Sequence, residues 1–444
     1  MTIIEHGPMF RKCDEYRTYW RSTSVSNQLN NKVTARAEQS VEASQPWRYW
    51  ALLVLLGLGL AISAMPSPLY ALYSDRWNYP AVMTTLIFAA YAAGALGAVL
   101  VSGAMSDRYG RKPVLLAALA FILLGLVVFV VAPNAGFLVV ARLLHGIGIG
   151  AVVVAAGAAL LDVRPEWAAR TGALNAIAFN LGIAVGAVCS ALLAQADVAP
   201  LTSPYVLFGM ISLAVGLAVL AMKEPHPVRK KSHHSGGLSI PRPHVPASVR
   251  ARFLFAVGGA GTAWALLGVF LSLEPGIATE VTGTGGPLFG GVMIAVFALG
   301  AAAAQSTTSS LPARKVAVTG DVASAILLIT GLLAFSSGNR ALILVNTALL
   351  GAAYGLAFGA SLRHLTSGLP PQERGAVISA FYLVTYSAMA IPTVLAGIGA
   401  TVWDATTILT PFSIVVVLVA LGTAMLGRST TQQSGGTDSN PPAQ

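Results

Sequence analysis

The sequence contains twelve apolar stretches, each long enough to cross a lipid bilayer as an α-helix. A helix needs about 20 apolar residues to span the hydrocarbon core. Only 10% of the 444 residues are charged, against about 25% in soluble proteins, so an ordinary water-facing surface is excluded. The sequence predicts an all-α membrane protein with helices at about 49–72, 80–104, 113–132, 136–160, 172–194, 202–222, 252–273, 286–306, 315–336, 340–362, 375–402 and 405–427.

The basic residues predict how these helices are oriented. All but Arg76, Arg340 and Arg142 of the 27 lysines and arginines lie in the tails or in alternate loops on one face. Basic loops mark the cytoplasmic side, which predicts a multi-pass protein of the cell membrane with both termini in the cytoplasm. Because this rule explains the formal net charge of +10, no nucleic-acid partner is predicted.

Polar stretches divide the chain. The N-terminal stretch lacks the apolar core of a signal peptide and is interpreted as a disordered cytoplasmic extension, or as sequence upstream of the true start codon. The linker histidines have no cysteine or carboxylate set at ligand spacing, so neither a metal nor a cofactor is predicted. The expected parts are an extension at 1–46, six helices at 47–223, a linker at 224–250, six helices at 251–428 and a tail at 429–444.

The two sets of six helices align with each other at an offset of about 203 residues. This alignment predicts a duplicated unit and two pseudo-symmetric six-helix bundles, although shared alanine and glycine content is an alternative explanation. Such parallel repeats are a transporter architecture, with the substrate site between the halves. The matching pairs are Arg111-Lys112 with Arg314-Lys315, Ala95–Ala98 with Ala298–Ala301, and Arg170–Ala173 with Arg374–Val377.

The loop after the second helix carries the most specific motif. It reads Gly103-Ala104-Met105-Ser106-Asp107-Arg108-Tyr109-Gly110-Arg111-Lys112. This stretch resembles the G-x-x-x-D-R-x-G-R-[KR] signature of the major facilitator superfamily (MFS), and with the helix pattern the resemblance covers about 47–428. It implies the MFS fold and a loop that latches the two halves in the outward-open state. That role is expected for Gly103, Asp107, Arg108, Gly110 and Arg111, with Asp162 as a partner.

The chemistry of this loop is consistent with such a role. Gly110 permits a tight turn, and Gly103 lets helices approach closely. Asp107 is expected near a helix N-terminus, and Arg111 is expected to pair with a carboxylate across a gate.

The fourth predicted helix carries Arg142 and His145 inside the membrane. The pattern resembles the family's R-x-x-Q-G, with His145 in place of Gln. A charge within the bilayer is a functional-site hypothesis by default. The alternative is that Arg142 extends toward the outer surface. The two side chains are three residues apart and share a helix face. This predicts either a proton relay or, for His145, a hydrogen bond to a neighbouring helix.

Other polar residues within the helices are candidates for a substrate or proton pathway. The titratable ones are Asp321, two turns into the ninth helix, and Glu274, after the seventh. The fifth helix departs from the family's antiporter pattern, which weakens a prediction of antiport. The uncharged candidates near a central cavity are Asn175, Asn180, Gln305, Asn346, Tyr354, Tyr382 and Tyr386.

Together these features predict a monomeric secondary transporter that moves a small molecule, with or without protons, by alternating access. Efflux of drug-like or sugar-like compounds is the expected activity, by family analogy. Proton-linked uptake or facilitated diffusion of a small metabolite is the alternative. An enzyme is not expected, because no nucleophile or metal constellation lies within the helices.

Overall fold

The structure is a computed structural model that describes residues 46–225, 243–283 and 286–434. Within these ranges it is helical and contains no strand. The chain divides after Trp50, and the described residues from Ala51 onward form one compact unit. The predicted extension, most of the linker and the end of the tail lie outside the described residues.

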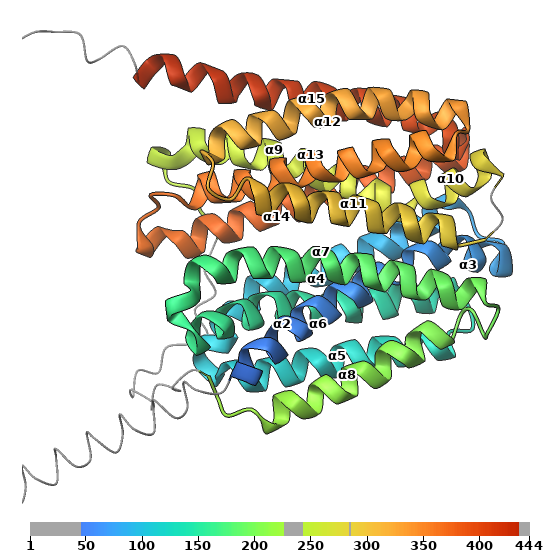
Figure 1. Ribbon diagram of the computed structural model, residues 1–444, viewed down its shortest axis with the longest axis horizontal. Helices are drawn as coiled ribbons and strands as arrows, with labels where there is room; N and C mark the ends of the chain where they lie inside the picture. Colours follow the sequence, from blue (N-terminus) through green and yellow to red (C-terminus); the bar gives the residue numbers. More distant parts are fainter. Residues whose placement is uncertain (1–45, 226–242, 284–285, 435–444) are drawn as a thin grey trace, which may run out of the picture. The chain divides into compact units, whose positions relative to one another are not determined.

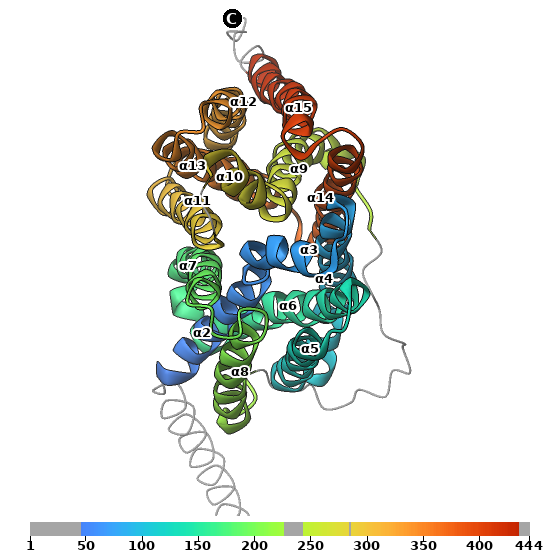
Figure 2. The same ribbon diagram turned by 90° about the vertical axis from the view of Figure 1, so that its right-hand side faces the viewer.

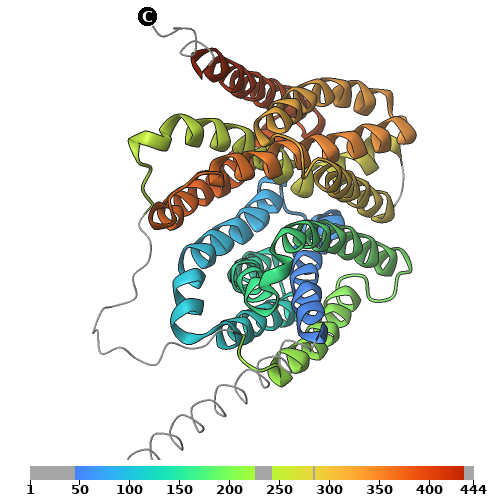
Figure 3. The same ribbon diagram turned by 60° about the vertical axis from the view of Figure 1, so that its left-hand side comes forward.

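The helices form two groups (Figures 1 and 3). The first group contains α2 (Pro46–Ala64), η1 (Ser67–Leu69), α3 (Tyr70–Trp77), α4 (Ala81–Tyr109), α5 (Arg111–Val131), α6 (Ala135–Val163), η2 (Pro165–Trp167), α7 (Ala168–Gln195) and α8 (Ser203–Ala221). The second contains η3 (Ala247–Val249), α9 (Arg250–Ser272), α10 (Glu274–Thr282), α11 (Leu288–Thr307), α12 (Ala313–Ser337), α13 (Arg340–Thr366), α14 (Pro371–Val402) and α15 (Ala405–Ser434).

Twelve helical spans in the described residues are long and apolar enough to cross a membrane, which confirms the predicted fold class. The predicted break at Trp403 and Asp404 separates α14 from α15. The first span is longer than predicted, because the helical path continues through η1 and α3 to Trp77. α15 also continues into the predicted tail as far as Ser434, since no proline or glycine interrupts the chain after Gly427 until Gly435.

The two groups repeat the same helix packing, as the internal sequence repeat predicts. In the first group, Gly146 and Gly150 of α6 lie against the backbone of α4, so that a Cβ at Gly146 would overlap the carbonyl oxygen of Tyr91. In the second, Gly351 and Gly355 of α13 lie against α11 in the same way. Small residues four apart let two helices approach to backbone contact, so the duplicated glycine pairs hold corresponding helices together in both halves.

The two groups meet along two helix pairs, α7 with α11 and α4 with α14 (Figure 2). A Cβ at Gly291 of α11 would lie 2.5 Å from the Cβ of Ala191 in α7. A Cβ at Gly397 of α14 would lie 2.7 Å from Thr85 Cγ2 in α4. These close approaches occur away from the end of the bundle where α4, α6, α8, α11 and α13 finish. That end is called the basic end, because it carries Arg108, Arg111, Lys112, Arg314, Lys315 and Arg363.

Candidate functional site

A cavity of about 620 Å³ lies between the two groups of helices. Its wall is built from both halves, chiefly from α2, α4, α6 and α7 on one side and α9, α11, α13 and α14 on the other. Most of the lining is aromatic or aliphatic, which is typical of a small-molecule site. The aromatic lining residues are Phe88, Tyr91, Phe179, Trp264, Tyr354, Phe358, Tyr382 and Tyr386.

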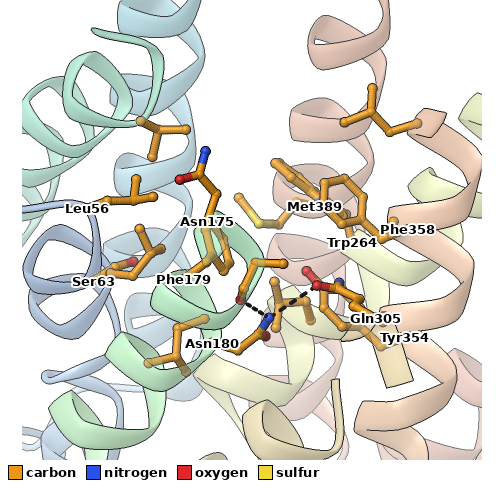
Figure 4. Close-up of a pocket in the computed structure, with 18 of the residues that line it drawn as sticks. Leu56, Ser63, Asn175, Phe179, Asn180, Trp264, Gln305, Tyr354, Phe358 and Met389 are labelled. Atoms are coloured by element: carbon orange, nitrogen blue, oxygen red, sulfur yellow. Dashed lines mark hydrogen bonds between the residues drawn. The ribbon is translucent and has the colours of Figure 1, made fainter. Parts of the chain in front are cut away.

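Three amide side chains supply polar groups in this apolar wall: Asn175, Asn180 and Gln305 (Figure 4). The Nδ2 group of Asn180 donates to Gln305 Oε1 at 3.3 Å and to Ala176 O at 2.8 Å. The first of these bonds joins α7 to α11. Asn175 Oδ1 makes no hydrogen bond to a described residue. A few such groups in an apolar cavity orient a ligand.

The cavity wall contains some of the predicted pathway residues but not all of them. Asn180, Tyr354 and Tyr382 line it. Asn346 does not, contrary to expectation: it lies between α12 and α13, where its amide donates to Leu327 O and accepts from Thr330 Oγ1. The helix pairing uses both polar atoms of this side chain, so it is a packing residue. Glu274 is buried at the start of α10, outside the lining.

Arg142 is completely buried and does not extend toward the outer surface. Its Nη1 donates to the carbonyl oxygen of Ser63 at 2.9 Å. The guanidinium lies 4.7 Å from the ring centre of Tyr91 and 5.7 Å from that of Phe88. Ser63, Tyr91 and Phe88 all line the cavity, so the positive charge lies directly behind the wall. No described carboxylate forms a salt bridge with it.

His145 is equally buried, but on the side of α6 that faces α5. Its ring lies 5.2 Å from the ring of Phe129, and a Cβ at Gly125 would overlap it. Neither ring nitrogen makes a hydrogen bond of normal geometry to a described residue. His145 does not line the cavity, so the imidazole packs between helices and lies apart from the cavity.

The loop between α4 and α5 is organised around Arg111. Its Nε donates to Asp162 Oδ2 at 3.0 Å, and its Nη1 donates to Asp107 Oδ1 at 2.5 Å and to Ser106 Oγ at 2.6 Å. The guanidinium is mostly buried, whereas the Asp107 side chain is 66% exposed. All three partners belong to the first half of the chain. The predicted pairing across a gate is therefore replaced, in this structure, by a cluster within one half.

Glu224, which the sequence did not single out, completes this cluster. Its carboxylate accepts from the backbone N–H groups of Arg111 at 2.7 Å and of Lys112 at 3.0 Å. It therefore satisfies the N-terminus of α5, the position where a negative charge is most favourable. Gly110 makes the expected tight turn with φ +101°, and a Cβ there would lie 2.7 Å from Glu224 Oε2. Gly103 makes no close approach, since a Cβ there would make only an ordinary contact with Val154.

The cavity extends from the middle of the helices to the basic end. Its lining includes Gly172 at the start of α7, Ser309 after α11 and Arg363 near the end of α13. At the opposite end the α7–α11 and α4–α14 contacts close the space, and Val82 N donates to Thr401 Oγ1 at 3.0 Å across the two halves. This arrangement is open toward the basic end and closed at the other.

Twelve spans in two repeated groups around a shared cavity define a polytopic membrane protein with the architecture of a transporter. The Major Facilitator Superfamily model matches residues 50–393, and the chain belongs to this family. The family and fold are those of transporters, which bind small molecules, and not of enzymes.

Curated relatives match parts of the chain. The class C tetracycline resistance protein of Escherichia coli is 32% identical over 187 residues, which cover 40% of this chain and 46% of that protein. The 4-hydroxybenzoate transporter PcaK of Pseudomonas putida is 29% identical over 266 residues, which cover 53% and 58%. The matches thus span about half the length of these relatives.

Solved structures share the fold along nearly the whole chain. A bacterial homologue of the human lysosomal transporter Spinster superposes with a TM-score of 0.70 at 14% identity, covering 88% of this chain and 98% of that one. The nucleoside transporter NupG gives 0.68 at 11% identity, covering 85% and 99%.

Proposed function

We propose that the chain exports amphipathic, aromatic drug-like compounds across the cell membrane by alternating access. The supporting observation is the cavity, whose lining is largely aromatic and aliphatic and carries three amide side chains among its polar groups. Planar aromatic ligands gain from burial against such rings. Sugars are less well matched, since each hydroxyl left without a partner in an apolar wall weakens binding. The similarity to a tetracycline resistance protein agrees with this substrate class.

The proposed orientation places the basic end and both termini in the cytoplasm. Basic residues gather on the cytoplasmic side of membrane proteins, and the loop with Arg108, Arg111 and Lys112 lies at that end. In this orientation the cavity is open to the cytoplasm, the state in which an exporter loads its substrate.

Accumulation of tetracycline and of a fluorescent aromatic amphiphile in expressing cells tests this proposal. Efflux lowers accumulation relative to cells with the empty vector. Truncation of a cavity ring, Trp264→Ala or Phe358→Ala, restores accumulation, while Phe121→Ala, a 39% exposed ring on α5, leaves efflux unchanged. Equal accumulation with and without the chain, for every aromatic probe, would refute export of this class.

Arg142 favours a second candidate function, the uptake of an aromatic carboxylate. An unpaired guanidinium directly behind Tyr91 and Phe88 makes the cavity favourable for an anion, because charge interactions are strong where water is excluded. The similarity to PcaK supports this candidate. Labelled 4-hydroxybenzoate tests it: uptake that is lost in Arg142→Gln favours this function, and no uptake by the unmodified chain excludes it for this compound.

A further inference from the structure

A cluster of buried oxygen atoms lies between α9, α12 and α13, outside the residues that line the cavity. Its members are Asp321 and Ser324 of α12 and Ser361 of α13, which are 1%, 3% and 0% exposed. Both carboxylate oxygens of Asp321 and the hydroxyl oxygens of the two serines make no hydrogen bond to any described residue. Four unpartnered oxygens in one buried place are unusual, since buried polar atoms nearly always have partners.

Gly259 of α9 shows that three of these oxygens converge. A Cβ built on Gly259 would lie 2.8 Å from Ser361 Oγ, 3.1 Å from Asp321 Oδ1 and 3.2 Å from Asp321 Oδ2. The absence of a side chain at this position leaves a small space that faces all three atoms. Ser324 lies one helical turn beyond Asp321 and therefore on the same face of α12.

The cluster carries a carboxylate but no matching positive side chain. No described lysine, arginine or histidine forms a salt bridge with Asp321. An ionised carboxylate inside a membrane protein is costly unless it is paired or coordinates a metal ion. The surrounding serine hydroxyls supply further oxygen ligands, which hard cations prefer.

We infer that Asp321, Ser324 and Ser361 form a binding site for Na⁺ at the α9–α12–α13 junction. One carboxylate balances one positive charge, whereas a divalent ion would leave an uncompensated charge in a low-dielectric interior. The space is narrow, because a Cβ built on Gly259 would already lie between 2.8 and 3.2 Å from three of these oxygens. This narrow space favours Na⁺ over the larger K⁺.

The position of the site connects it to the cavity. Two of the helices that meet there also supply cavity rings: Trp264 on α9 and Phe358 on α13, whose ring centres are 5.4 Å apart. Phe358 precedes Ser361 by three residues and therefore shares its helix face. A cation that draws α12 and α13 toward α9 thus fixes the wall of the cavity as well.

Na⁺ binding is measured on the purified full-length chain in detergent. Equilibrium binding of ²²Na⁺ is expected to saturate at about one ion per chain, the single-site case. The melting temperature is expected to rise in a saturable way when NaCl replaces choline chloride at constant ionic strength, and to rise less with KCl. Asp321→Asn and Gly259→Ala abolish both effects. Gly422→Ala, where a Cβ meets nothing within 4 Å, and Ser272→Ala, whose hydroxyl donates only to its own helix, preserve them.

The absence of saturable ²²Na⁺ binding by the unmodified chain would overturn the inference even if a variant failed to fold. Equal Na⁺ stabilisation of the unmodified chain and Asp321→Asn would overturn it too. A stabilisation that depends on pH instead of Na⁺, and that is lost in Asp321→Asn, would show that the Asp321 carboxyl group binds a proton in place of Na⁺. That result would also overturn the inference. The inference goes beyond the proposed function, and neither measurement uses a transported compound. Failure of the Na⁺ inference therefore leaves the export proposal intact. Failure of the export proposal likewise leaves the Na⁺ inference intact.

Discussion

The side-chain amide of Asn180 on α7 donates a hydrogen bond to Gln305 on α11, and this bond links the two halves of the chain at the wall of the cavity (Figure 4). At 3.3 Å it is longer than the usual distance of about 2.9 Å. In the proposed alternating-access mechanism the halves move apart, and a long bond between them is readily exchanged for a bond to a ligand. The proposal therefore expects substrate binding and the relative movement of the halves to be coupled at this pair.

Loss of this pair is expected to affect transport more than folding. Asn180→Ala and Gln305→Ala each raise the KM for a transported aromatic compound, while the melting temperature changes little, since one such bond contributes about 1 kcal/mol. A double-mutant cycle on kcat/KM measures their coupling, which is expected at about 0.5–1.5 kcal/mol. Strictly additive effects would show that the two amides act independently.

The Arg111 cluster is expected to control transport. Asp107→Asn and Arg111→Ala abolish transport while leaving expression intact, because the first weakens and the second removes the ion pairs that organise the loop. Asp162→Asn is expected to have the same effect, since it removes the other carboxylate that contacts the guanidinium. Transport assays with matched membrane expression levels check this, and normal transport in all three variants would remove the loop from the mechanism.

Glycine packing between α4 and α6 is expected to be essential for folding. Gly146→Ala places a methyl group against the carbonyl oxygen of Tyr91, and overpacking of this kind costs about 1–3 kcal/mol or more. Gly157→Ala on the same helix meets nothing within 4 Å and serves as the control. Gly351→Ala repeats the clash in the second half, against Phe297. The folded yield and melting temperature of the three variants, measured in detergent, should separate the control from the other two.

Stability is expected to depend on pH through Glu274. Burial raises the pKa of its carboxyl group from 4.5 to about 8, because the charged form is disfavoured away from water. Between pH 4.5 and about 8 the folded chain keeps a proton that the unfolded chain has released, so this group makes the protein less stable as the pH rises through that window.

Melting temperatures across the window test the assignment. Glu274→Gln, which is neutral at every pH, is expected to melt with a weaker pH dependence than the unmodified chain. Glu280→Gln changes an exposed carboxylate on the same helix and should leave the dependence as it was. A pH profile that Glu274→Gln does not alter would assign the titration to another group.

The sequence alone determined the number of spans, the break between α14 and α15, the duplication and the family. The number of spans follows from the bilayer itself, which requires about 20 apolar residues per helix. The duplication and the family follow from the repeated residue patterns and the loop motif. It also identified Arg111 as a residue that needs a carboxylate partner, because the motif fixes both residue types and spacing. Glu224 was not identified, since it lies 113 residues away from Arg111 and only folding brings it to the start of α5.

Only the tertiary structure decided which polar and aromatic side chains face the cavity. In a soluble helix the buried face is revealed by a periodic apolar stripe. Lipid is as apolar as a protein core, so the lipid-facing and protein-facing sides of a membrane helix are similarly apolar in sequence. Asn180 and Asn346 therefore look equivalent in sequence, yet one lines the cavity and the other pairs α13 with α12. Phe121 and Phe358 divide in the same way, the first exposed and the second in the cavity wall. These differences depend on which face each helix directs toward its neighbours in the folded chain.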